Sequence, residues 1–163
     1  MLSRRQFSLA GLGLALSVAG PREPAGAAET EEFEIMKTDE EWKKTLTKEQ
    51  YAVLRGHGTE RAGSSPLDKT YAPGTYLCAA CDLPLFSSDA KFDSGTGWPS
   101  FFAPIENAVA TSTDWKLIYP RTEVHCRRCG GHLGHVFDDD PQPTGKRYCM
   151  NGVAMKFEPK AQS

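Results

Sequence analysis

The stretch Cys126-Arg127-Arg128-Cys129-Gly130 and the earlier stretch Cys78-Ala79-Ala80-Cys81 are two C-x-x-C turns with 44 residues between them. Thiolates at this spacing form the two halves of a tetrahedral metal site, most often for zinc. Because four cysteines leave no open position on the metal, we expect one structural Zn²⁺ per chain, which ties the early β region to the late one. Gly130 is predicted to have a positive φ that turns backbone amides toward the sulfurs. Two disulfides, a thioredoxin-like redox pair and an iron–sulfur cluster are the alternatives that the spacing leaves open.

The residues around these turns predict a mainly antiparallel β domain with two or three N-terminal helices. Short runs rich in β-branched and aromatic residues alternate with glycine, proline and Asp/Asn, as in short strands. Two capping-box patterns, Thr38 with Glu41 and Thr47 with Gln50, each predict the start of a short helix. The predicted strands are residues 75–78, 109–113, 115–119, 122–127, 147–151 and 153–157.

The first 27 residues differ in composition from the rest of the chain. Arg4 and Arg5 precede an apolar run over residues 7–20, and Ala25-Gly26-Ala27 then has the small-x-small form of a signal-peptidase site. This arrangement resembles a twin-arginine export signal. The run is shorter than the ~20 residues of a membrane-spanning helix. We therefore expect residues 1–27 to be a cleaved signal peptide and the mature protein to be in the periplasm, with no stable membrane anchor.

Composition restricts the classes of partner. The chain has 163 residues, of which 25% are charged and 39% hydrophobic, so it is neither disordered nor collagen-like. Without the three basic and one acidic residues of the leader, 16 basic and 20 acidic side chains remain, a formal charge of −4. An acidic domain binds phosphates poorly, so we expect no nucleic-acid partner. A charged segment over residues 28–35 is predicted to be a flexible linker.

The fifth cysteine, Cys149, has no partner once the other four bind a metal. In a strand, the side chains of Arg147, Cys149 and Asn151 share one face, so a cation and an amide flank the thiol. Arg147 would favour the thiolate, which is the nucleophilic form. These neighbours predict a reactive Cys149, with a buried and inert cysteine as the alternative.

Two histidines lie three positions apart in His132-Leu133-Gly134-His135. A regular strand would place them on opposite faces, so a bend or bulge at Gly134 is needed to bring them together. Histidines supply protons near neutral pH. A second metal site with a third ligand such as Asp138, or solvent-exposed loop histidines, are the competing interpretations.

The segment over residues 94–102 is rich in glycine, which permits a tight turn that leaves Trp98 available as a wall. The alternative is a plain turn with a tryptophan in the core.

Taken together, eight motifs resemble the B-type methionine sulfoxide reductases, which are specific for the R epimer. The resemblance covers residues 36–158, followed by a tail over residues 159–163. It implies two antiparallel sheets leaning together as a tent, short N-terminal helices and a structural zinc. The motifs are Gly58-Thr59-Glu60, Cys78-x-x-Cys81, Leu85-Phe86-Ser87-Ser88, Lys91-Phe92-Asp93-Ser94-Gly95, Gly97-Trp98-Pro99-Ser100-Phe101, Cys126-x-x-Cys129, His132-Leu133-Gly134-His135-Val136-Phe137 and Arg147-Tyr148-Cys149-x-Asn151.

The resemblance also implies the chemistry of peptide-methionine (R)-S-oxide reduction, an oxidoreductase reaction that repairs oxidised proteins under oxidative stress. Cys149 attacks the sulfoxide sulfur, and the products are methionine and a cysteine sulfenic acid. A histidine protonates the oxygen as the S–O bond breaks, with His135 as first choice and His132 as second.

The same resemblance implies roles for the residues around the nucleophile. Trp98 packs against the S-methyl group, so that a wall for methyl opposite a donor for oxygen selects one epimer. Phe137 is a second substrate-binding residue. Arg147 holds Cys149 ionised, and Asn151 helps to position the pocket.

One departure from the family concerns Thr96, which occupies the position where many members carry a resolving cysteine. The chain has five cysteines, so an external thioredoxin-like protein or a small thiol must reduce the sulfenic acid. The substrate is expected to be an oxidised protein or free methionine-R-sulfoxide. The alternatives are a non-catalytic zinc-knuckle binding module and a zinc hydrolase that uses His132 and His135 as ligands.

Overall fold

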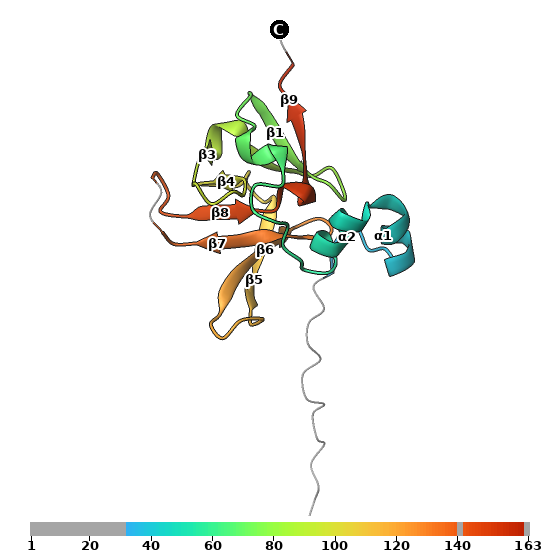
Figure 1. Cartoon of the computed structure of the whole chain (residues 1–163). Helices are drawn as coiled ribbons and strands as arrows, with labels where there is room; N and C mark the ends of the chain where they lie inside the picture. Colours follow the sequence, from blue (N-terminus) through green and yellow to red (C-terminus); the bar gives the residue numbers. More distant parts are fainter. Residues whose placement is uncertain (1–31, 140–141, 162–163) are drawn as a thin grey trace, which may run out of the picture. The chain divides into compact units, whose positions relative to one another are not determined.

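The computed structural model describes residues 32–139 and 142–161. Within these residues, nine strands form a three-stranded and a six-stranded antiparallel sheet, preceded by two short helices (Figure 1). This arrangement confirms the predicted mainly β fold with two antiparallel sheets. The leader expected over residues 1–27 lies outside the described residues. None of the described helices has the length and apolar character that crossing a membrane requires.

Both predicted capping boxes are present and begin the helices α1 (Asp39–Thr45) and α2 (Lys48–Leu54). The Thr38 hydroxyl accepts from the Glu41 amide, and the Glu41 carboxylate accepts from the Thr38 amide at 2.8 Å. Such reciprocal bonds satisfy amides that the first turn leaves without partners. Each helix buries only one side, through Trp42 in α1 and Leu54 in α2. Three short 3-10 helices follow: η1 (Pro66–Lys69), η2 (Ser88–Ala90) and η3 (Gly152–Ala154).

The smaller sheet has the order β2-β1-β9, with β1 (Gly74–Cys78), β2 (Pro84–Ser87) and β9 (Met155–Pro159). Strand β1 ends at Cys78, so the first C-x-x-C turn begins at the end of this strand.

The larger sheet has the order β3-β4-β8-β7-β6-β5. Strand β8 lies between β4 and β7, and its residue Cys149 pairs with Ser100 on one side and with His135 on the other. The strands are β3 (Lys91–Phe92), β4 (Ser100–Phe101), β5 (Val109–Asp114), β6 (Arg121–Cys126), β7 (His132–Phe137) and β8 (Arg147–Met150).

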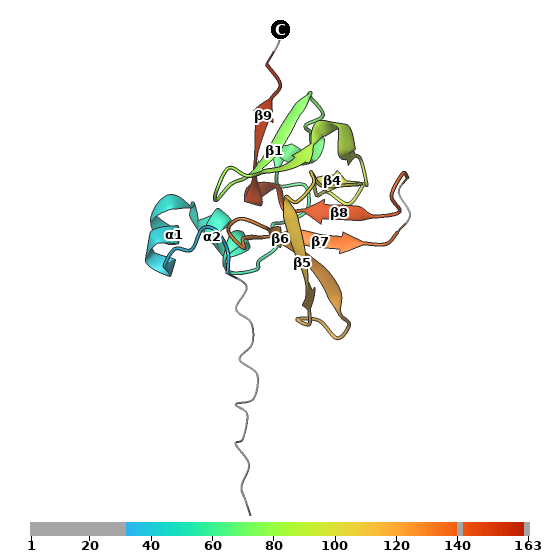
Figure 2. The same cartoon turned by 180° about the vertical axis from the view of Figure 1, so that it is seen from behind.

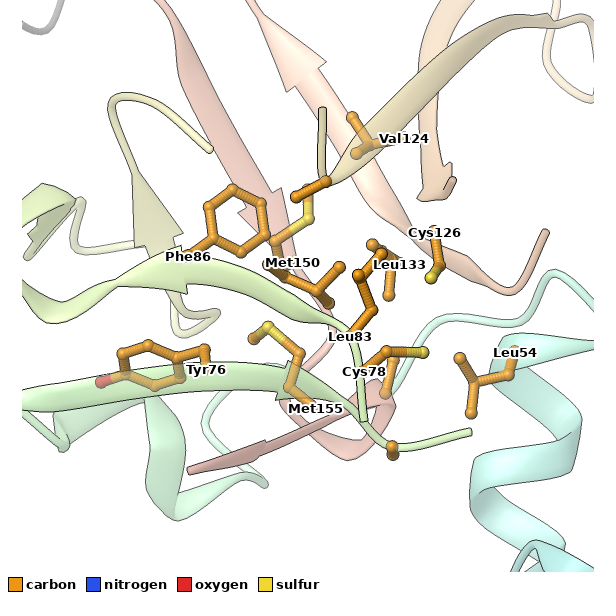
Figure 3. Packing of buried hydrophobic residues seen from close by; sticks show 14 of the residues in the cluster. Leu54, Tyr76, Cys78, Leu83, Phe86, Val124, Cys126, Leu133, Met150 and Met155 are labelled. Atoms are coloured by element: carbon orange, nitrogen blue, oxygen red, sulfur yellow. The ribbon is translucent and has the colours of Figure 1, made fainter. Parts of the chain in front are cut away.

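The core lies between the two sheets (Figure 3). Tyr76 and Phe86 from the smaller sheet and Met150 and Leu133 from the larger sheet are fully buried there. Phe86 stacks on Phe101 with ring centroids 4.3 Å apart. Because side chains alternate along a strand, burial of Met150 directs its neighbour Cys149 to the opposite face of β8.

Two of the predicted strands are wrong in whole or in part. Residues 115–119 form the exposed loop between β5 and β6, because their apolar side chains find no neighbouring strand; Ile118 is fully exposed. The predicted strand over residues 153–157 begins as η3 and becomes extended only at Met155. Strands β2, β3, β4 and β7 were not among the predicted strands.

The described part of the expected linker contacts the domain. The Phe33 ring packs edge-on against His125, and the Ile35 amide donates to the Arg128 carbonyl at 3.0 Å. At the other end, β9 extends to Pro159, and the Lys160 amide still bonds the Pro73 carbonyl.

Candidate active site

Cys149 has two cross-strand neighbours that share its face of the sheet. Directly paired residues of antiparallel strands project to the same side, so Ser100 on β4 and His135 on β7 flank the thiol. The close approach of β7 to β8 requires glycine at position 134, because a Cβ there would collide with the Cys149 carbonyl oxygen. The Thr96 hydroxyl completes the surroundings at 4.0 Å from the Cys149 sulfur.

Cys149 lines a small cavity of about 140 Å³. The cavity brings together five residues that the sequence analysis singled out: Cys149, His135, Trp98, Phe137 and Asn151. Two other predicted site residues, His132 and Arg147, are not among its lining residues. The cavity is also lined by Gly134, where a bend was predicted, and by Thr59 and Arg121, for which no role was predicted.

The thiol of Cys149 is not held ionised at rest. Burial raises its pKa above the ordinary value, and the positive charge of Arg147 and hydrogen bonds from Thr96, Arg147 and Ser100 oppose this rise without cancelling it. Arg147 is also engaged in an ion pair, since its Nε and Nη2 lie 2.8 and 2.7 Å from the Asp139 carboxylate. Its guanidinium also covers the Phe137 ring at 4.6 Å from the centroid. Arg147 therefore acts in the predicted direction but is too weak to ionise the thiol.

His135 is fixed by a carboxylate that the sequence analysis missed. Its Nε2 lies 2.8 Å from Asp114 Oδ2, and the same oxygen accepts from Arg121 Nη2 at 2.6 Å. Burial lowers the pKa of His135 and the Asp114 hydrogen bond opposes this, while the Arg121 charge adds to the lowering. The pKa of Asp114 is held far below its usual range, first by the Lys116 amide and then by His135 and Arg121. Asp114 therefore stays ionised beside a histidine that is neutral at rest.

His132 packs edge-on against His135 and is more deeply buried, with the two ring centroids 5.4 Å apart. Its Nδ1 lies 2.6 Å from Glu123 Oε1, and the same oxygen contacts His57 Nδ1 at 2.8 Å. Burial pushes the pKa of Glu123 up, but the hydrogen bond and charge of His132 and the charge of His57 outweigh it and hold the value at about 2. His132 Nε2 is buried and has no hydrogen-bond partner among the described residues.

The predicted irregularity in β7 is present, one residue earlier than expected. Val124 pairs with Gly134 and His125 with His132, so one step along β6 matches two steps along β7, and the extra residue is Leu133. This bulge lets both histidines approach the same side.

A second metal site made of His132, His135 and Asp138 does not form. His135 bonds Asp114, and Asp138 pairs with Lys146 at 2.7 Å. Outside the four-cysteine cluster, the only group of possible metal ligands in the described residues is His57, Glu123 and His132.

Glu60 connects several parts of the site. The sequence analysis included it in one of the family motifs, Gly58-Thr59-Glu60, but predicted no role for it. Its carboxylate accepts from the amides of Gly152 and Val153 at 2.6 and 2.9 Å. Its backbone carbonyl accepts from Trp98 Nε1 at 3.1 Å, and its amide donates to Asn151 Oδ1 at 2.9 Å. Trp98 and Asn151 are thus held by one residue from a distant segment.

The amide of Asn151 is used within the protein. While Oδ1 accepts from Glu60, Nδ2 donates to the Leu133 carbonyl at 3.0 Å. Both bonds tie the end of β8 to its surroundings, which agrees with the predicted role in positioning the pocket.

The four remaining cysteines form one cluster. The sulfurs of Cys78 and Cys129 are 3.7 Å apart and those of Cys81 and Cys126 are 3.5 Å apart. Thiolates bound tetrahedrally to Zn²⁺ at ~2.3 Å are separated by roughly 3.8 Å, so the cluster fits this metal. Gly130 has the predicted positive φ, of 66°. All five cysteines lie in the described residues and none is in a disulfide, so Cys149 is chemically separate from the cluster.

Comparison with known proteins gives consistent matches over the β domain. Residues 46–159 match the SelR domain family. The peptide methionine sulfoxide reductase MsrB of Leptospira interrogans is 53% identical over 127 residues, which are 77% of this chain and 97% of the relative. MsrB of Agrobacterium fabrum is 54% identical over 126 residues, 77% of this chain and 93% of the relative. The chloroplastic peptide methionine sulfoxide reductase B1 of Arabidopsis thaliana is 50% identical over 155 residues, 94% of this chain and 76% of the relative.

Proposed function

This chain belongs to the B-type methionine sulfoxide reductases, the SelR family, and from that membership we propose how its residues carry out the reaction. The enzyme reduces methionine-R-sulfoxide, and Cys149 is the nucleophile. The observation that carries this assignment is the pairing of Cys149 with His135 across β8 and β7, at a cavity that Trp98 also lines. A non-catalytic zinc-knuckle module would leave this cavity and its cysteine without use.

The reaction moves two electrons from Cys149 to the sulfoxide. The Cys149 sulfur attacks the sulfoxide sulfur and forms an S–S bond, while the protonated oxygen leaves as water when the S–O bond breaks. A water molecule then adds to the Cys149 sulfur and the S–S bond breaks, which releases methionine and leaves Cys149 as a sulfenic acid. His135 supplies the proton to the oxygen because it is the histidine that lines the cavity, and Asp114 stabilises the imidazolium form. His132 is a positioning residue behind it.

Epimer selection follows from a wall and a donor on opposite sides of a chiral sulfur. Trp98 receives the S-methyl group, and its indole is fixed by the bond to the Glu60 carbonyl. With the methyl on this wall and the sulfur facing Cys149, only one epimer points its oxygen at His135. Phe137 forms a further apolar part of the cavity.

We propose that the four-cysteine cluster holds one structural Zn²⁺. A metal closed by four thiolates supplies no open coordination position and therefore stabilises the fold. Cys78 is the last residue of β1 in the smaller sheet and Cys81 follows it, while Cys126 is the last residue of β6 and Cys129 lies in the turn that leads to β7. The metal would thus join the two sheets at a point away from Cys149.

Regeneration of the enzyme requires an external thiol. Family membership implies such a reductant and a protein-bound sulfoxide as substrate. The four clustered cysteines belong to the metal site, so we propose that a thioredoxin-like protein or a small thiol attacks the Cys149 sulfenic acid directly.

We also propose that the enzyme works in the periplasm. The support is the arrangement of Arg4, Arg5 and Ala25-Gly26-Ala27 in the sequence, which lies outside the described residues. Terminal sequencing of the protein recovered from a periplasmic extract should begin at Ala28. Recovery of the intact leader in the cytoplasm would contradict this proposal.

Incubation with separated R and S epimers of methionine sulfoxide and dithiothreitol tests the activity. Methionine should be released from the R epimer alone. Equal release from both epimers, or release from neither, would overturn the assignment.

A further inference from the structure

The loop between β5 and β6 exposes an unusual concentration of apolar surface. Six large apolar or aromatic side chains are exposed in the part of the chain that the structure describes, and four of them belong to this loop. They are Trp115, Leu117, Ile118 and Tyr119, with exposed fractions of 72%, 46%, 103% and 57%. Contiguous apolar exposure of this kind marks binding surfaces more often than isolated exposed residues do.

The loop is not needed for the core. The hairpin of β5 and β6 projects away from the rest of the larger sheet, and its tip is remote from the smaller sheet in both views (Figures 1 and 2). None of the four side chains belongs to the buried cluster between the sheets. Their apolar character therefore calls for an explanation outside folding.

Both ends of the loop are part of the active site. The residue before the loop, Asp114, contacts His135, and Arg121 at the start of β6 lines the cavity of Cys149. Arg121 and Asp114 also pair with each other at 2.6 Å, and the Lys116 amide bonds Asp114 Oδ1 at 2.8 Å. The loop is thus anchored to the catalytic groups.

A short stretch of extended polypeptide is long enough to reach from the cavity to the loop. An extended chain rises by about 3.3 Å per residue. Ile118 is four positions beyond Asp114 and therefore lies within roughly 13 Å of the edge of the site by the same rise. An extended substrate with its sulfoxide in the cavity covers this distance in about three or four residues.

We propose that residues 115–119 bind apolar side chains that flank the methionine sulfoxide in an unfolded polypeptide substrate. This inference rests on the proposed function, since it extends the same site. Methionine is itself apolar and is commonly buried among apolar neighbours, which unfolding would expose together with the oxidised side chain. The loop would then hold the substrate by contacts made equally before and during the chemical step.

Charge makes a lipid surface the weaker candidate. Lys116 is the one charged residue in the loop, and its Nζ is 3.3 Å from the His57 carbonyl. Surfaces that bind anionic lipids collect several basic residues, whereas residues 28–163 carry a formal charge of −4.

Kinetics on matched peptides test the proposal. Two nonapeptides carry a central methionine-R-sulfoxide and differ only by leucine or serine three and four positions away on each side. Each kcat/KM is divided by the value for free methionine-R-sulfoxide. The wild type should favour the leucine peptide by about fivefold or more, through KM and with similar kcat. In the double variant Leu117→Ser, Ile118→Ser, the kcat/KM of the leucine peptide should be about equal to that of the serine peptide. The control Met36→Ser removes an exposed side chain elsewhere and should keep the wild-type preference for the leucine peptide.

Three outcomes would overturn the proposal. A double variant that keeps the wild-type preference shows that the loop does not read the flanking residues. The loop would be assigned to a membrane surface if the wild type reduces both peptides equally well and sediments with phosphatidylglycerol vesicles, and the double substitution abolishes this sedimentation. A concentration-dependent dimer that the double substitution dissociates would assign it to self-association. Failure of the wild type to reduce methionine-R-sulfoxide both in the peptides and as the free amino acid, in contrast, would refute the proposed function itself.

Discussion

The Thr96 hydroxyl oxygen lies 4.0 Å from the Cys149 sulfur, in a turn that hydrogen bonds hold in place. The Thr96 hydroxyl bonds the Ser94 hydroxyl at 2.8 Å, and the carbonyl of the next residue, Gly97, accepts from the Gly63 amide at 2.7 Å. Because disulfide bonds require Cβ atoms that are already close, a cysteine in place of Thr96 is positioned to react with Cys149.

We therefore expect Thr96→Cys to introduce an internal resolving thiol. After one equivalent of R-sulfoxide without reductant, the wild type should release one methionine and keep a trappable sulfenic acid on Cys149. The variant should instead form a disulfide between positions 96 and 149, which peptide mass spectrometry detects. Thr96→Ser is the matched control and should retain the sulfenic acid. A wild-type disulfide between Cys149 and a cysteine of the metal cluster, with loss of zinc, would contradict the single-cysteine mechanism.

Cys149→Ser should abolish turnover while preserving zinc content and fold. A serine hydroxyl cannot be oxidised by the sulfoxide as the cysteine sulfur is, and Cys149 is not in the cysteine cluster. Methionine release, zinc stoichiometry and Tm are the measurements. Residual sulfoxide reduction in this variant would exclude Cys149 as the nucleophile.

Cys78→Ser and Cys129→Ser should each lower zinc content and stability, because three thiolates no longer close the site. We expect Tm to fall by more than about 10 °C. Cys149→Ser serves as the control, since it removes a cysteine that does not belong to the cluster. Variants with unchanged Tm and metal content would show that the four cysteines do not bind zinc.

Substitutions of the two histidines should affect different properties of the enzyme, and they should slow the reaction to different extents. His135→Gln removes the group that faces the cavity and should slow the reductase step by about 100-fold or more, with little effect on alkylation of Cys149 at pH 7. His132→Gln acts through the buried pair with Glu123, so it should lower Tm as well as the rate. Single-turnover methionine release and thermal unfolding separate the two. A larger rate loss in the His132 variant would reverse the assignment of the acid.

Local signals explain which parts of this structure the sequence predicts. The helix starts at Thr38 and Thr47 depend on residues three positions away. The two C-x-x-C turns likewise depend on residues within their own motif. Glu60, in contrast, bonds partners more than 90 positions away, and no local pattern indicates such a contact.

At residues 115–119, a local pattern predicts a strand that does not form. Its apolar and aromatic residues have high strand propensity, yet strand formation depends on a neighbouring strand that is absent at the tip of the hairpin. Asp114, just before it, was overlooked because its partner His135 is 21 positions away and is reached only through the pairing of β5, β6 and β7.

The pH dependence of the reductase step should show a broad plateau with two limbs. Burial places the pKa of His135 below its ordinary 6.5 and that of Cys149 above its ordinary 9.0. Between these values, the resting pair of thiol and imidazole carries as many protons as the reactive pair of thiolate and imidazolium, so kcat/KM is constant. Below the pKa of His135 an extra proton leaves the thiol unable to attack, and above the pKa of Cys149 the imidazolium is lost. An acid limb centred above pH 6.5, or an alkaline limb centred below pH 9.0, would contradict these directions.

Asp114→Asn tests the cause of the acid limb. The Asp114 hydrogen bond raises the pKa of His135 against the effect of burial, so its loss should shift the acid limb to lower pH. The plateau should also fall, because the reactive pair contains an imidazolium that the carboxylate no longer stabilises. Asp138→Asn is the matched control, since Asp138 is exposed and pairs with Lys146, whereas His135 bonds Asp114. A profile that moves to higher pH in the Asp114 variant, or moves equally in both variants, would show that this carboxylate does not set the proton affinity of the acid.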